Sequence, residues 1–184
     1  MPDAYLYALI IGCEAAFWVV LALALAVRYL LRRETVSRYL LFLLPAVDLL
    51  LLLFTALDLK SGTPATFAHG LATAYVGFTV AFGALMVAWA DERFAHRFAG
   101  GPAPSANPKH GWPAIRYEMR LWLRSLLAWA IALVLIVALI AFIDQREQTK
   151  ELENWFMFAA GSTFFWFLFG PLWILVFSMK SPEA

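Results

Sequence analysis

Five long apolar runs dominate the sequence, and each is close to the roughly 20 helical residues that cross the hydrocarbon core of a bilayer. They cover residues 5–31, 39–59, 67–90, 123–143 and 155–177. Inside lipid the backbone finds no water, so each span must satisfy its N–H and C=O groups internally, as a helix does. The sequence therefore predicts an all-α polytopic membrane protein, a single bundle of five transmembrane helices.

Composition agrees with this class and argues against others. The chain is 63% hydrophobic and 15% charged, whereas a soluble domain is nearer half apolar and one quarter charged. A net charge of +1 gives no general attraction for nucleic acid. No basic residue precedes the first apolar run, so we expect that run to be a span and not a cleavable signal.

Basic residues in the connections predict the orientation of the spans. The first connection and the connection between the third and fourth spans hold the basic residues Arg28, Arg32, Arg33, Arg38, Arg93, Arg97, Lys109, Arg116, Arg120 and Arg124. The other two connections, LDLKSGTP and IDQREQTKELEN, hold one and two basic residues. Because basic loops stay on the cytoplasmic side, we expect the N-terminus outside and the C-terminus in the cytoplasm.

The longest connection divides into two parts. Residues 91–111 include the Gly- and Pro-rich stretch AGGPAPSANPKHG and predict a flexible cytoplasmic loop. Residues 112–124 predict a basic interfacial helix or an extension of the fourth span. Arg116, Arg120 and Arg124 recur every fourth residue, so they form one stripe that would contact anionic lipid headgroups. Ordinary charge anchoring without a specific lipid is the alternative for this stripe.

Ionisable residues inside the spans are the main candidates for a site. Glu14, Asp48, Asp58 and His69 each cost about 2.5–3.5 kcal/mol at the centre of a membrane helix, so they should face the bundle interior, with Tyr75, as a buried polar site. Asp48 has two interpretations. Either it forms a hydrogen bond to another helix, or it is a binding site for an ion or a proton.

The short turn between the second and third spans predicts that Asp58 and His69 lie side by side and join two helix ends. Such a pair would favour an imidazolium beside a carboxylate. A pH-responsive or metal-binding role and a merely solvated histidine are the alternatives for His69.

Features of the third, fourth and fifth spans predict how the helices pack. Thr73, Gly77 and Ala81 share one face with His69, and small residues at this spacing let helices approach closely, including those of a second copy. The fourth span has no polar group and is expected to be a peripheral, lipid-facing helix. Gly170-Pro171 predicts a kink in the aromatic fifth span.

Motifs for catalysis or cofactor binding are missing from the sequence. It contains no phosphate-binding loop, dinucleotide fingerprint, HExxH or GxSxG motif. One histidine within the spans cannot supply intrachain bis-His haem ligation, and no His/Cys spacing suits zinc. We therefore expect no catalytic residue, metal or cofactor, and no enzymatic activity.

The segments FAHGLATAYVGFTVAFG and WADERFAHRFAGGPAP resemble those of small bacterial multi-pass membrane proteins known only as hypothetical membrane proteins. The resemblance is strongest from Asp48 to Pro104. It implies a five-helix topology in the bacterial cytoplasmic membrane and supplies no catalytic residues.

These observations favour a small accessory or interaction protein whose partners are membrane lipids, a second copy of the chain or another membrane protein. An ion- or proton-coupled carrier or channel that uses Glu14, Asp48 and His69 is the alternative. A lipid- or quinone-binding protein that uses the fifth span and the basic stripe is a second alternative.

Overall fold

A computed structural model describes residues 2–177, apart from the side chains of residues 2–7, Ile10 and Glu14. Its elements are helical: α1 (Pro2–Tyr29), α2 (Glu34–Lys60), α3 (Phe67–Ala99), α4 (Gly111–Ile143), α5 (Arg146–Phe167), a π-helical turn η1 (Leu168–Leu172) and α6 (Trp173–Phe177). Five stretches are long and apolar enough to cross a membrane, with α5, η1 and α6 together forming the last. The chain is therefore an all-α, multi-pass membrane protein.

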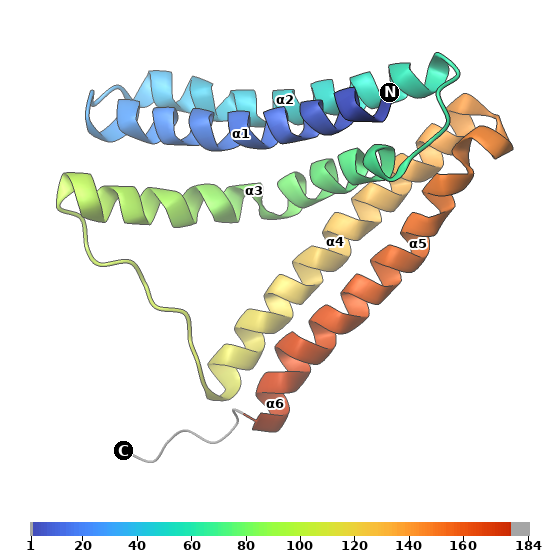
Figure 1. The fold of residues 1–184 in the computed structure, drawn as a ribbon. Coiled ribbons are helices and arrows are strands. Elements are labelled where there is room, and N and C mark those ends of the chain that lie inside the picture. The colour runs from blue at the N-terminus through green and yellow to red at the C-terminus, as the bar shows by residue number, and fades with distance from the viewer. Residues whose placement is uncertain (1, 178–184) are drawn as a thin grey trace.

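The helices form two groups that meet at an acute angle (Figure 1). Helices α1, α2 and α3 lie alongside one another, and α4 and α5 form a hairpin that leans away from them. The α2–α3 and α4–α5 connections lie together at one end, which we call the closed end. At the opposite, open end, α3 and α4 diverge and residues 100–110 bridge the distance between them.

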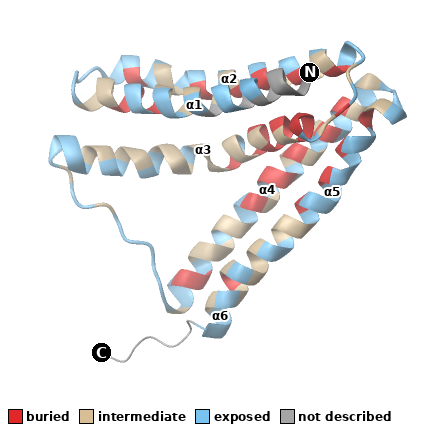
Figure 2. Cartoon of the chain, viewed as in Figure 1, coloured by how far each residue is buried: buried red, intermediate tan, exposed pale blue. Residues whose placement is uncertain are grey.

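Buried residues gather where α3, α4 and α5 converge toward the closed end (Figure 2). Trp155 and Leu152 of α5 pack there with Ile136 of α4 and Leu59 of α2. Along α4, Ala128, Ala132 and Ile136 are fully buried. The expectation that the fourth span is wholly peripheral is thus wrong, because small side chains allow close helix contact in lipid without any polar group.

Close packing of α3 on α4 depends on Gly77. A Cβ atom added there would lie 2.3 Å from the Ala128 carbonyl oxygen, so any side chain would force the two backbones apart. Thr73 and Ala81, on the same face of α3, are also buried. This face is therefore covered within a single chain, and a second copy would have to use another surface.

Several helices extend beyond the limits expected from hydropathy. Helix α3 continues to Ala99 and ends at Gly100, whose φ is +66°, so the loop spans 100–110 and not 91–111. Helix α4 includes residues 112–124 without a break, so this segment extends the fourth span and forms no separate helix. Helix α5 begins at Arg146, nine residues before the expected start at 155. Hydropathy marks the edge of the lipid, and a polar sequence can continue a helix past it.

The Gly170-Pro171 pair interrupts the last span as a π-helical turn. Proline has no N–H and its ring clashes with the preceding helical turn, so the regular ladder of α5 cannot pass through it.

Candidate functional site

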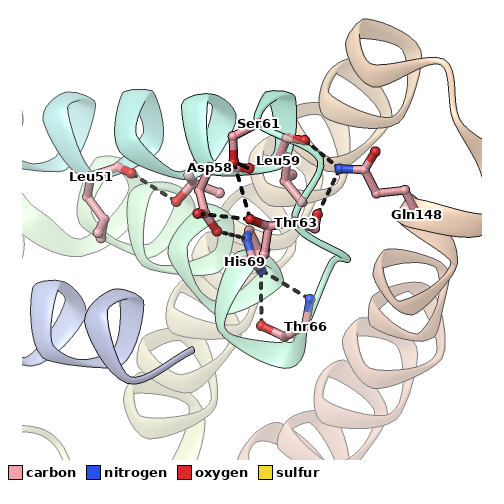
Figure 3. A network of polar contacts seen from close by, with 9 residues as sticks. Leu51, Asp58, Leu59, Ser61, Thr63, Thr66, His69 and Gln148 are labelled. Carbon is pink, nitrogen blue, oxygen red and sulfur yellow. Dashed lines mark hydrogen bonds and ion pairs between the residues drawn. The ribbon is translucent and has the colours of Figure 1, made fainter. Parts of the chain in front are cut away.

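The polar network at the closed end joins α2 to α3 (Figure 3). His69 Nε2 lies 2.9 Å from Asp58 Oδ2, between the last turn of α2 and the first turn of α3. The His69 side chain is 1% exposed and that of Asp58 is 33% exposed. The pair expected from the short turn is therefore present, with its carboxylate toward the aqueous edge.

The other ring nitrogen of His69 favours one tautomer. The backbone N–H of Thr66 donates to His69 Nδ1 at 3.1 Å, which is the reciprocal half of a capping box. A backbone N–H can only donate, so this contact favours the tautomer whose proton is on Nε2, facing Asp58. The helix cap and the contact with Asp58 thus use opposite sides of one imidazole ring, and an imidazolium beside the carboxylate stays a prediction.

Gln148 connects α5 to the same network. Its side-chain amide nitrogen donates to the carbonyl oxygens of Leu59 and Thr63, the latter at 2.7 Å (Figure 3). The backbone N–H of Ala65 donates to the Gln148 carbonyl at 2.8 Å. Sequence reasoning missed this residue, since one glutamine in a polar connection carries no distinguishing signal.

Asp48 forms a separate connection between α2 and α3. Its side chain is buried, with 3% exposure, and accepts a hydrogen bond from the Thr79 hydroxyl. Thr79 lies ten residues beyond His69 on α3, about 15 Å along the helix axis. The candidate polar site is therefore divided into two contacts at different depths.

The remaining candidates for that site are Tyr75 and Glu14. Tyr75 packs beside Leu51, Ala68 and Ala72, and it lines an apolar cleft. The side chain of Glu14 lies outside the described residues.

At the open end, a further polar contact joins α1 to α3. Asp91 accepts hydrogen bonds from the Arg28 guanidinium at 3.2 Å and from the Tyr29 hydroxyl at 3.0 Å. The sequence placed Asp91 in a loop, whereas it lies within α3.

The basic stripe of α4 is divided by its contacts. Arg124 donates to the Ala81 carbonyl of α3 at 3.0 Å, so this residue serves helix packing in addition to any headgroup contact. Arg116 and Arg120 are exposed and line a shallow cavity of about 420 Å³ near the start of α4. Trp122 Nε1 donates to the Thr163 carbonyl of α5 at 3.1 Å and holds the α4–α5 hairpin.

These contacts bind helices to one another. Within the described residues, no three His, Cys, Asp or Glu side chains lie close enough together to hold a metal ion. Asp58, His69, Asp91, Arg124 and Trp122 instead form bonds between helices.

Comparison with known proteins gives one informative match. The chain is 39% identical over 146 residues to the "Uncharacterized membrane protein YmcC" of Bacillus subtilis (strain 168), covering 79% of this chain and 78% of that protein. No family model matches the chain. No solved structure matches it either. Identity at this level over most of both lengths, together with five apolar helices, shows that the chain belongs to the same family as this Bacillus membrane protein.

Proposed function

We propose that the protein is a non-enzymatic accessory protein of the bacterial cytoplasmic membrane that binds other membrane components. The observation that carries this proposal is the use of its intramembrane polar groups. Asp48 bonds to Thr79, and Asp58 bonds to His69, so both carboxylates serve contacts between α2 and α3. Groups engaged in this way stabilise a scaffold and are poorly placed to exchange ions.

Charge and the bacterial relative support the proposed location and orientation. The basic connection after α1 and the loop 100–110 lie at the open end, where α3 ends with Arg97 in its last turn. This arrangement supports an open end in the cytoplasm and a closed end outside.

Lipids and other helices are the proposed partners. The exposed Arg116 and Arg120 suit anionic headgroups. Exposed aromatic rings along α5, η1 and α6 provide a surface for another membrane helix or a second copy of the chain, since the Gly77 face is already covered. These rings include Phe164, Phe165, Phe169 and Trp173.

Flux through proteoliposomes separates this role from a carrier. Vesicles that contain the purified chain and an internal pH-sensitive dye are given a pH or sodium gradient. We expect no flux above that of empty vesicles for the wild type and for Asp48→Asn. Flux that disappears in Asp48→Asn but persists in an Arg116→Gln/Arg120→Gln double variant would show a carrier and overturn the accessory role.

A further inference from the structure

Two neighbouring cavities follow the half of α3 that leads to the open end, and both are lined by Trp18 and Met86, so we treat them as the inner and outer parts of one cleft. The inner part has a volume of about 320 Å³ and is mainly aromatic. The outer part has a volume of about 350 Å³ and lies between α3, the loop 100–110 and α4. Its rim is polar and consists of Glu92, Arg93, Ser105, Asn107 and Tyr117.

The two parts match two depths of a bilayer. At 1.5 Å per residue, Glu92 lies about 35 Å along α3 from His69, so the two residues are at opposite membrane interfaces. The cleft continues inward to Tyr75, about 25 Å from Glu92, which is more than the thickness of one hydrocarbon leaflet, about 15 Å. The rim is thus at headgroup level and the aromatic part is at acyl-chain level.

The rim presents one anion and one cation that do not neutralise each other. Glu92 and Arg93 are consecutive on a helix and point in different directions. Neither forms an ion pair with any residue that the structure describes. The Arg93 guanidinium stacks 4.0 Å from the centre of the Trp89 ring and donates one N–H to the Trp89 carbonyl, so most of its five N–H groups remain for a ligand. Ser105 donates to the Glu92 carboxylate at 3.4 Å.

We propose that this cleft binds a phospholipid whose headgroup carries both a phosphate and a primary ammonium. The phosphate bonds to Arg93, the ammonium bonds to Glu92, and one acyl chain occupies the aromatic part. A purely anionic headgroup would leave Glu92 opposed by like charge, and a quaternary ammonium has no N–H to donate to it. The site does not depend on the proposed accessory role, because a carrier could hold the same lipid.

Native mass spectrometry with competing lipids tests the site. The purified full chain is equilibrated with equal parts of phosphatidylethanolamine, phosphatidylcholine and phosphatidylglycerol, and the lipid retained on the protein is identified. A charge-assisted hydrogen bond supports about ten-fold selectivity, so we expect phosphatidylethanolamine to be retained about ten-fold over phosphatidylcholine. Equal retention of these two lipids, or preferred retention of phosphatidylglycerol, would overturn the proposal.

Variants of Glu92 and Arg93 test which part of the headgroup each charge binds. Glu92→Gln should remove the preference for phosphatidylethanolamine over phosphatidylcholine, and Arg93→Gln should weaken the retention of both about ten-fold. Exposed residues at the same end but outside the cleft, Glu34→Gln and Arg97→Gln, serve as matched controls that should leave retention unchanged. If the controls change retention as much as the rim variants, general surface charge is responsible and the site is refuted.

Gly83 tests the acyl-chain part separately. It lines the inner part of the cleft, and an added Cβ would meet only the Thr79 methyl group, at 3.6 Å. Gly83→Leu should therefore fold and fill the cleft, lowering the retention of all three lipids without changing their order. Retention equal to that of the wild type in a folded Gly83→Leu protein would contradict an acyl chain in this part.

Discussion

At the scale of single residues, the absence of a side chain at Gly77 allows α3 to approach α4 closely. Gly77→Ala should lower the free energy of unfolding by roughly 1–3 kcal/mol, because the new methyl group would lie 2.3 Å from the Ala128 carbonyl oxygen and the helices would have to separate. Unfolding in mixed micelles of increasing denaturing-detergent content measures this change.

Gly83→Ala is the matched control on the same helix. Its Cβ has room beside Thr79, and alanine favours a helix over glycine by up to about 1 kcal/mol, so this variant should be as stable as the wild type or slightly more stable. Equal losses at the two positions would show that helix propensity, and not the contact with α4, governs both.

The sequence predicted individual polar residues better than their partners. The short turn was enough to pair Asp58 with His69, because it leaves two helix ends side by side. Thr79 as the partner of Asp48 depends on how far α3 is displaced along α2, which spacing alone does not define. The His69 tautomer also could not be predicted from the sequence, since a histidine replaces the usual Glu or Gln of a capping box.

At the scale of helices, the contact between α5 and the α2–α3 turn depends on Gln148. Replacing it with leucine leaves the carbonyl groups of Leu59 and Thr63 without this donor, so Gln148→Leu should lower the free energy of unfolding by about 1–3 kcal/mol. Gln145→Leu is the matched control, because the Gln145 side chain makes no capping bond to α5. The same detergent titration measures both, and an equal effect of the two variants would contradict the role of Gln148.

Helix number was predictable from the sequence, whereas helix ends were not. Lipid requires each span to be apolar over a fixed length, which gives a strong signal for every helix. The polar first turns of α5 and last turns of α3 lie outside that constraint, so they resemble loops in the sequence. Lys150 and Arg97 illustrate this, since both are charged, exposed and helical.

At the scale of the whole molecule, the two helix groups and their divergence at the open end arise from contacts between distant residues. The approach of Gly77 to Ala128 and the bond from Arg124 to Ala81 place α4 across α3. The small residues of α3 predicted a close helix contact but did not identify α4 as the partner, which is why a buried face on α4 was not expected.

Orientation is testable with single cysteines. In a Cys13→Ser background, Glu147→Cys at the closed end should react in intact cells with a membrane-impermeant maleimide, whereas Ala103→Cys in the 100–110 loop should react only after lysis. Both positions are exposed, so they are matched in accessibility. The reverse pattern would place the N-terminus in the cytoplasm.

The central claim is that polar residues at the ends of the spans act as links between helices, and the Asp58–His69 pair is its clearest case. A double-mutant cycle of Asp58→Ala, His69→Ala and the double variant, each unfolded in mixed micelles, isolates their coupling from the other bonds of each residue. The hydrogen bond of 2.9 Å to a partly exposed carboxylate predicts a coupling of at least about 1 kcal/mol. A coupling within about 0.5 kcal/mol of zero would contradict the claim.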